Sequence, residues 1–399
     1  MAEQTQEQST ELSDQIESRA SSREDSQVYI ASQWQLMWWR FRSHKLAMIS
    51  GVVLLGFYLI GALCGFLSHG DANFSDYRFA YMKPQALHWF HEDGFGPYVY
   101  GVDSKRNPDT LKMEHFVNEE VRHPITFFVR QREYKFIGIF KTDIRFMGIA
   151  GELTEADSVV DERPFPYLLG SDKLGRDMWS RILEGTRISL SIGLVGVFIS
   201  MILGITMGGL SGFYGGWVDT IIQRIIEITR SIPTIPLWIA LAAAVPRDWD
   251  VFRIYFAITI IISLLAWTEL GRVVRGRFLA LREEEFVMAA KLTGANDVRI
   301  IFRHMVPAFL SHIIAAASLA IPFMIISETA LSFLGLGLRA PAISYGVLLQ
   351  AAQNVQSVAV YPWLMIPAFP VTVVVLAFNF MGDGLRDAAD PYGSGGNSE

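Results

Sequence analysis

The sequence has a single cysteine, Cys64, in 399 residues, and few charged residues. One thiol has no partner within the chain, so the sequence excludes a fold held together by intrachain disulfides. Charged residues make up 19% of the chain and hydrophobic residues 51%, whereas soluble globular domains carry about a quarter charged residues. We therefore expect the chain to lie largely within a lipid bilayer.

The sequence also lacks any Gly-Lys dipeptide, so it has no phosphate-binding loop of the kind that nucleotide hydrolases use. His69, His88 and His91 occur in one polar stretch, but without further cysteines or a convincing set of carboxylates they are weak candidates for a metal site. We expect no catalytic residue, no metal and no bound cofactor in this chain, and no nucleic acid among its partners.

Residues 1–33 form an acidic and polar segment that cannot bury enough apolar surface to offset the entropy of ordering, so we expect a disordered tail. The next segment, 34–67, contains an apolar run over 46–67. Its length of roughly 20 residues suits a helix that crosses about 30 Å of hydrocarbon. The run is too long for the apolar part of a signal peptide and has no small-residue cleavage site after it, so it predicts a first membrane-spanning helix.

Five further apolar segments make six predicted membrane-spanning helices in an all-α membrane protein. They are residues 188–211, 222–245, 251–270, 309–334 and 361–380, all within a predicted core at 184–383. Several prolines interrupt them and are expected to kink the helices: Pro233, Pro236, Pro322, Pro367 and Pro370. Four glycines share nearly one face of the second helix, a pattern typical of close helix packing: Gly204, Gly208, Gly209 and Gly212.

The distribution of basic residues predicts the orientation, because Lys and Arg in short loops favour the cytoplasm. Basic residues precede the first helix and crowd the loop 271–306, whereas the segment 335–360 has only Arg339. Both ends of the chain, including a C-terminal tail at 384–399, are therefore expected to be cytoplasmic. The long polar segment 68–183 is expected on the opposite side of the membrane.

Within that exterior segment, apolar and polar residues alternate over 125–129 and again over 134–140, around the charged break 130–133. This alternation predicts a β-hairpin, and hence a small β-containing insert between the first and second helices. Further along, Asp172, Arg176 and Asp177 are expected to hold the start of the second helix through charge pairs and caps.

Two acidic residues fall inside or at the end of predicted helices. Glu328 lies well inside the fifth helix, where an unpaired charge costs roughly 2.5 to 3.5 kcal/mol, so it is not expected to face lipid. It either lines a path for a transported solute or makes a structural hydrogen bond to a neighbouring helix. Glu269 is expected to pair with Arg272 at the inner end of the fourth helix.

The loop 271–306 is predicted to contain two short helices. Helical propensity runs through 282–293, with Phe286, Ala289 and Ala290 on one face, and Gly294 stands where a left-handed residue ends a helix. Asn296 or Asp297 can cap a second helix, which stops at Pro307. The first short helix is expected to lie across the inner face of the membrane and to present small side chains to another protein.

The stretch 285–307, EFVMAAKLTGANDVRIIFRHMVP, resembles the loop through which permeases of ABC importers contact their ATPase subunits. The family pattern is Glu-Ala-Ala, three residues, Gly, then a hydrophobic residue and Pro. Met288 stands where the family often has Glu, and Val306 replaces Leu. The resemblance implies a helix that docks in a groove of the ATPase and transmits its closure to the pore. Its residues here are Glu285, Phe286, Ala289, Ala290, Gly294 and Pro307.

Four other stretches are similar to the dipeptide, oligopeptide and nickel permeases of that family, in their C-type subunit: residues 168–190, 212–219, 327–338 and 382–391. The resemblance implies the type I importer permease fold, with the exterior segment as a periplasmic insert, in a bacterial inner membrane. It implies half of a pore for peptides, with a second homologous permease, a periplasmic substrate-binding protein and two ATPase subunits, which hold ATP and Mg, as partners. The chain itself would not be an enzyme.

Three alternative functions share some of these sequence features. A nickel or other small-solute importer shares the same motifs and stays open. An ion-coupled secondary transporter needs buried ionisable groups and usually internal repeats, and the sequence offers no repeat and only Glu328. A membrane-anchored exterior sensor or scaffold would leave five predicted spans unexplained.

Overall fold

The computed structural model of the protein describes residues 33–91, 94–109, 113–136, 140–149, 166–246 and 248–389. The predicted N-terminal tail therefore lies outside the described residues except for Gln33, which begins helix α2 (Gln33–Ser43). The predicted C-terminal tail is described only over 384–389. These residues belong to the last turns of helix α15 (Ala368–Ala389), so the helix extends beyond the apolar run that predicted it.

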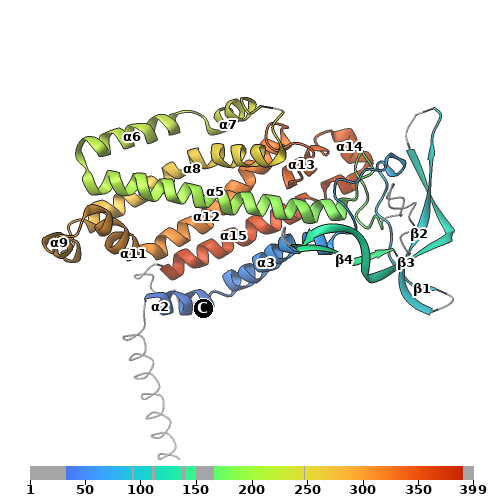
Figure 1. Ribbon diagram of the computed structural model, residues 1–399, viewed down its shortest axis with the longest axis horizontal. Helices are drawn as coiled ribbons and strands as arrows, with labels where there is room; N and C mark the ends of the chain where they lie inside the picture. Colours follow the sequence, from blue (N-terminus) through green and yellow to red (C-terminus); the bar gives the residue numbers. More distant parts are fainter. Residues whose placement is uncertain are drawn as a thin grey trace, which may run out of the picture.

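Long helices run side by side in one elongated bundle, with a β-sheet at one end (Figure 1). Five of the described helical segments are long and apolar enough to cross a membrane: α3 (Lys45–Ala62), α5 (Met178–Tyr214), α8 (Val251–Leu281), α12 (Leu310–Phe333) and Pro362–Ala389, which joins η3 (Pro362–Met365) to α15. Val197 of α5, Ile262 of α8 and Met324 of α12 meet in a shared apolar core.

The predicted third span, 222–245, is not one helix. It consists of α6 (Gly216–Ser231) and α7 (Thr234–Ala243), which are bent by 89° relative to each other. Pro233 stands at the start of α7 and has no backbone N–H to continue the hydrogen bonds of α6. The described chain thus has five helices that can cross a membrane, and six if the bent pair forms one span.

Helix α5 begins at Met178, ten residues before the apolar run that predicted it. Asp177 caps its N-terminus by accepting hydrogen bonds from the backbone N–H groups of Trp179 (3.2 Å) and Ser180 (2.9 Å). Its first turns are polar in sequence but buried, and Arg181 is only 2% exposed. Hydropathy alone therefore misplaces this start.

The glycine face of α5 packs directly on α8, as predicted. A Cβ atom added to Gly208 would lie 2.3 Å from the carbonyl oxygen of Gly271, and one added to Gly212 would lie 2.7 Å from that of Arg275. Real Cβ atoms do not approach a carbonyl oxygen so closely, so the glycines set the distance between the two backbones.

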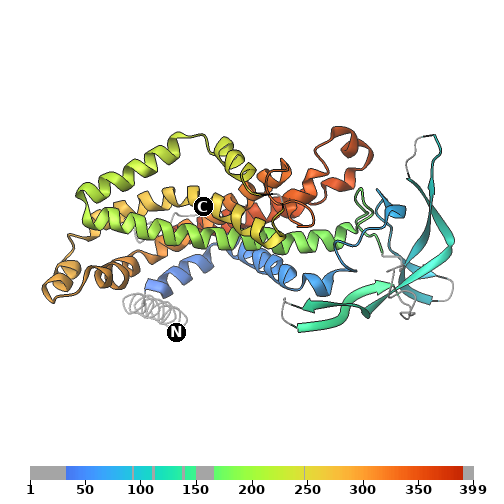
Figure 2. The same ribbon diagram turned by 45° about the horizontal axis from the view of Figure 1, so that its top comes forward.

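The insert contains a four-stranded antiparallel sheet in the order β1 (His88–His91), β2 (Gly94–Arg106), β3 (Met113–Phe136) and β4 (Phe140–Ile149) (Figure 2). The position predicted for the turn of the hairpin was wrong. Residues 125–129 and 134–136 lie on the same strand, β3, and the charged break between them is a shift of register against β4. An irregularity within a strand interrupts the alternation of apolar residues as a turn does.

The two ends of the insert meet beside the helices. The backbone N–H of Gln85 donates to the carbonyl of Tyr167 (2.9 Å), whose own N–H donates to the Gln85 side chain (2.8 Å). The Tyr81 ring stacks on Tyr361 at 4.1 Å, and the Trp363 indole N–H donates to the carbonyl of Ser171 (2.9 Å). The base of the insert is thus part of the helical core.

Shorter elements complete the chain. Near the sheet they are α4 (Cys64–Leu67), η1 (Tyr77–Phe79), α13 (Tyr345–Gln350) and α14 (Val355–Val360). At the other end of the bundle they are α9 (Glu285–Leu292), α10 (Asp297–Arg299), the π-helical turn η2 (Ile300–Met305) and α11 (Val306–Ala308).

Candidate functional site

The predicted docking helix, α9, lies at the end of the bundle opposite the sheet (Figure 1). Glu285 occupies its first turn, which suits the positive end of the helix dipole. The loop that contains α9 leaves α8 and returns to α12, so both flanking helices are membrane-span candidates.

One face of α9 holds it to the bundle. Val287 is fully buried and Ala290 is 8% exposed, and both pack in an apolar cluster with Phe278 of α8, Ile300 and Met305. The prediction had placed Ala290 on the outward face with Phe286 and Ala289, and this was wrong for Ala290. The spacing of Val287 and Ala290, three residues apart, is the sequence signal that identifies the buried face.

The other face of α9 is exposed and largely apolar. Phe286 is 41% exposed, Met288 50% and Leu292 87%, and the small side chain of Ala289 is also exposed. Exposed apolar side chains gathered on one short helix are typical of a protein contact surface. Met288, which departs from the family pattern, therefore belongs to the outward face.

Gly294 ends α9 in the left-handed conformation, with φ +78°, as predicted. The N–H of Ala295 donates to the carbonyl of Ala290 and that of Gly294 to Lys291, both at 3.0 Å. Asn296 then caps α10 by accepting from the N–H of Arg299 (2.9 Å). Pro307 lies at the start of α11, where a missing N–H is tolerated.

Contacts that the sequence did not suggest tie this loop to the end of α5. The Tyr214 hydroxyl donates to Asp297 at 3.0 Å, and the Lys291 ammonium lies 5.2 Å from the centre of the Phe213 ring. Nearby, Arg275 of α8 makes a two-pronged contact with Asp219 of α6, at 2.5 and 2.6 Å. The end of α5 therefore contacts the loop that contains α9, and α6 is joined to α8 by the ion pair.

The predicted pair of Glu269 and Arg272 is confirmed, at 3.1 Å, and Arg230 of α6 contacts the same carboxylate. Arg230 and Glu269 also line a cavity of about 470 Å³ between α7, α8 and α12. The rest of its wall is mainly apolar and includes Trp238 and Phe323. Within the described residues, the cavity is a candidate for a surface that contacts a solute or a second permease.

Glu328 is fully buried between α12 and α5. The Ser332 hydroxyl donates to Oε1 at 2.7 Å and the Ser189 hydroxyl to Oε2 at 3.3 Å. Those hydroxyls accept in turn from the backbone N–H groups of Leu338 (3.0 Å) and Tyr345 (3.1 Å). This network supports the structural alternative. A direct contact with a solute requires α12 to move from α5, so a place in the translocation path stays a prediction.

The charged residues before α5 have the structural role that was predicted for them. Asp172 accepts from the N–H of Arg176 (3.1 Å) and pairs with its guanidinium at 2.7 Å. His69, a weak candidate for a metal ligand, is fully buried: it stacks on Trp179 at 5.6 Å and lies 3.4 Å from Asp177. Among the described residues, no group of three or more His, Cys, Asp or Glu side chains is arranged to hold a metal.

A buried tyrosine, Tyr167, lies at the base of the insert. The Tyr167 hydroxyl donates to the carbonyl of Gly175 at 3.1 Å, and burial raises the pKa of this phenol. The hydrogen bond holds the turn before α5, and the ring packs in the small core with Met82 and Phe79.

Comparison with known proteins bears on this arrangement. The sequence model of the "binding-protein-dependent transport system inner membrane component" family matches residues 200–392. The model of the "N-terminal TM domain of oligopeptide transport permease C" matches residues 32–84. Neither covers residues 85–199, which include the sheet and the first turns of α5.

Two curated relatives are permeases. A dipeptide transport system permease protein of Alkalihalophilus pseudofirmus is 42% identical over 227 residues, which are 56% of this chain and 72% of that protein. An oligopeptide transport system permease protein of Bacillus subtilis is 37% identical over 226 residues, with the same two shares. Among solved structures, the inward-facing MetNI methionine ABC transporter aligns with a TM-score of 0.40 and 18% identity, over 53% of this chain and 98% of that chain. On the strength of the identity to the two permeases, this chain belongs to the inner-membrane components of binding-protein-dependent transport systems.

Proposed function

We propose that the chain forms half of the translocation pore of an ATP-driven importer of peptides in a bacterial inner membrane. The observation that carries the proposal is the exposed apolar face of α9, which is held at the end of the bundle by a buried opposite face. The relatives named for dipeptide and oligopeptide transport support peptides as the substrate class. Nickel complexes or another small solute are the alternative.

The proposed partners follow from this role. Two ATPase subunits, which hold ATP and Mg, dock on α9 and on the equivalent helix of a second, homologous permease. A periplasmic substrate-binding protein delivers the peptide at the end that carries the sheet. The crowding of basic residues in 271–306 supports a cytoplasmic location for α9, with both ends of the chain on that side.

The contacts of α9 suggest how its movement reaches the pore. Val287 and Ala290 pack on Phe278 of α8, and Met305 belongs to the same core. Close-packed side chains transmit displacement because they have little free volume. A pull on α9 by closing ATPase subunits would therefore move α8 and, through Met305, the start of α12. Glu328 joins α12 to α5 and is placed to respond to that movement.

Copurification with the ATPase subunits tests the docking surface. Ala289→Trp adds bulk to the exposed face of α9 and is expected to remove the ATPase chains from the purified complex, with loss of uptake. Ala359→Trp, on the exposed surface of α14 at the opposite end, is the matched control and should retain them. Ala290 is unsuitable for this test because it is buried, and a bulky replacement there would disturb the fold.

Retention of the ATPase subunits and of full uptake by Ala289→Trp would refute the assignment of this face. The substrate is tested separately, by uptake of defined peptides into cells that lack this chain. If peptide uptake is unchanged while nickel uptake falls, the peptide assignment is wrong and the permease assignment stands.

A further inference from the structure

The hairpin of β3 and β4 is fastened to the end of the first membrane-spanning helix. Helix α4 follows α3 almost directly, and the Arg145 guanidinium of β4 donates to the carbonyl of Gly65 at 3.0 Å and to the Ser68 hydroxyl. The Tyr134 ring of β3 lies against Gly65 and under the same guanidinium, at 4.7 Å. The hairpin therefore has a fixed height relative to the end of α3.

That height corresponds to the membrane surface. Helix α3 has 18 residues, which span about 27 Å and nearly cross the hydrocarbon core. Phe66 lies four residues beyond Ala62, and so about 6 Å past the end of α3. Each headgroup layer is roughly 5 to 8 Å deep. The residues that touch Phe66 thus lie at the depth of the lipid headgroups.

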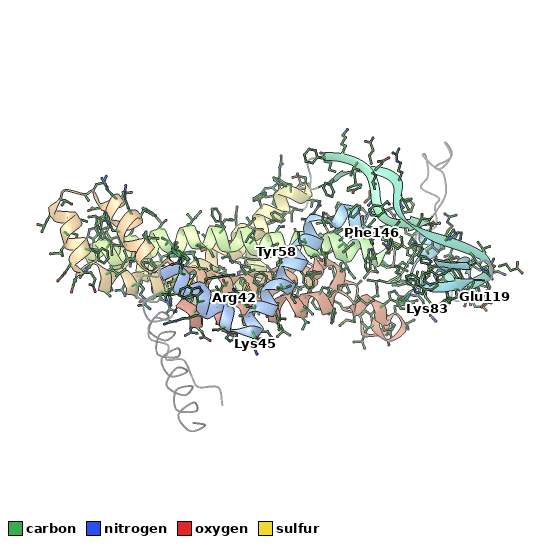
Figure 3. All side chains as sticks on the ribbon, turned by 90° about the horizontal axis from the view of Figure 1, so that it is seen from below. Arg42, Lys45, Tyr58, Lys83, Glu119 and Phe146 are labelled. Carbon is green, nitrogen blue, oxygen red and sulfur yellow. The ribbon has the colours of Figure 1, made fainter. Side chains whose placement is uncertain are left out.

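Aromatic side chains of the hairpin gather around Phe66. Phe146 lies 5.8 Å from Phe66, between rings, and Phe127 lies 5.4 Å from Phe146. Figure 3 shows Phe146 at the junction between the curved hairpin and the end of the first helix. Phe127 is 50% exposed and Phe128 66%. Exposed Phe side chains on one surface are typical of segments whose apolar face enters the boundary between headgroups and acyl chains.

The free end of the hairpin points back toward the helical bundle, not away from it (Figures 1 and 2). There Phe136 pairs with Phe140, which is 65% exposed, and the next pair is Lys135 with Lys141. Two like charges directly opposite each other destabilise a sheet. An acidic surface would relieve that repulsion, and the exposed ring next to it would enter an apolar layer.

We propose that the β3–β4 hairpin rests on the phospholipid leaflet at the outer end of α3. The rings of Phe127, Phe128 and Phe140 enter the boundary between headgroups and acyl chains, and Lys135 and Lys141 contact acidic phosphates. The surface continues the outward row of α3, where Val52 is 65% exposed and Leu55 60%, as expected for lipid-facing residues. This inference does not depend on which solute the permease carries.

Depth measurement on the full-length chain in nanodiscs tests the proposal. Cys64 is first replaced by serine, which can keep the hydrogen bond to Glu184. An environment-sensitive fluorophore is then attached in Phe140→Cys or Phe127→Cys. The matched control is Phe116→Cys, which is 54% exposed on the part of β3 that pairs with β2. The discs contain phosphatidylcholine and phosphatidylglycerol, with or without lipids that carry a quencher on the acyl chain.

Compared with the probe at 116, the probe at positions 140 and 127 is expected to emit at shorter wavelength and to be quenched by the labelled lipids. Iodide dissolved in the water should quench it only weakly. The probe at 116 should show the reverse. Equal access of iodide to all three positions would overturn the proposal. The proposal would also be overturned if the probe at 140 is protected from iodide only when the substrate-binding protein is added. That result would assign the surface to a protein partner.

The charge contribution has its own test. Contact with acidic lipid should make the emission and quenching of the probe at 140 differ between discs with phosphatidylglycerol and discs of phosphatidylcholine alone. In the Phe140→Cys background, making both Lys135→Gln and Lys141→Gln should abolish that difference. An unchanged difference would show that these two lysines do not contact the acidic lipid.

Discussion

Gly208 lies where α5 and α8 approach each other most directly through their backbones. An alanine there would place its Cβ 2.3 Å from the Gly271 carbonyl oxygen and 2.9 Å from the Val274 side chain. The helices must then separate, and overpacking of this kind costs about 1 to 3 kcal/mol. We expect Gly208→Ala to lower the thermal unfolding midpoint of the detergent-purified protein by several degrees.

Gly276 of α8 provides the matched control, since a Cβ added there meets nothing within 4 Å. Alanine also has the higher helix propensity, by up to about 1 kcal/mol. Gly276→Ala should therefore leave the midpoint unchanged or raise it slightly. Equal midpoints for the two variants would mean that α5 and α8 do not depend on the glycine contact.

At the scale of the element, two ion pairs join α6 to the bundle and differ in their surroundings. The side chains of Asp219 and Arg275 are 19% and 32% exposed, and they meet in a two-pronged contact. Those of Glu269 and Arg230, which join α8 to α6, are 66% and 42% exposed. Exposed pairs contribute at most about 1 kcal/mol, because water and salt screen them, whereas partly buried two-pronged pairs are stronger.

We expect double-mutant cycles to reproduce this order. Coupling between Asp219→Asn and Arg275→Gln should exceed coupling between Glu269→Gln and Arg230→Gln, and only the second should vanish as salt concentration rises. Thermal unfolding of the purified single and double variants measures both couplings. A larger coupling for the exposed pair would show that burial does not govern the attachment of α6.

Sequence patterns predicted the existence of the long helices, because apolar runs reveal burial in lipid. They did not predict where these helices begin or how sharply they bend. Helix α5 starts in residues that are polar yet buried, among them Arg181, and hydropathy does not identify such residues. The bend between α6 and α7 lies at Pro233, which was noted only as a kink. The angle of a bend depends on the helices that pack against it.

The loop around α9 likewise has features that the sequence predicted and features that it did not. Gly294 and Asn296 determine local backbone geometry. The sequence predicted Gly294 as the end of α9 and Asn296 as one of two candidate caps, because caps need only neighbouring residues. The buried face of α9 was placed wrongly at Ala290, because burial depends on Phe278 and Met305 from distant parts of the chain. In the insert, the register shift of β3 after Arg130 was taken for a turn because both interrupt alternation.

At the scale of the whole molecule, the sheet is an addition to a helical core. Gln85 and Tyr167, which flank it, are hydrogen-bonded to each other. Insertion of one unit into another leaves such adjacent ends. The base of the insert belongs to the core, since Tyr81 stacks on Tyr361 and Ser171 accepts from Trp363. We therefore expect the unit that can be separated to be smaller than the predicted insert of 68–183.

Because the ends of the sheet-containing unit meet at Gln85 and Tyr167, we expect the core to fold without the residues between them. Replacing residues 87–165 with a short Gly-Ser linker should leave the helical core folded, because the linker has only to join two neighbouring positions. Copurified ATPase subunits and a cooperative thermal transition would show that the core persists. Excision of 79–171 is the control, and should abolish folding because it removes Tyr81 and Ser171 from the core. If the smaller excision also prevents folding, the contacts of Arg145 and Tyr134 with the end of α3 are needed to hold the first helix in place, and the sheet is an integral part of the permease.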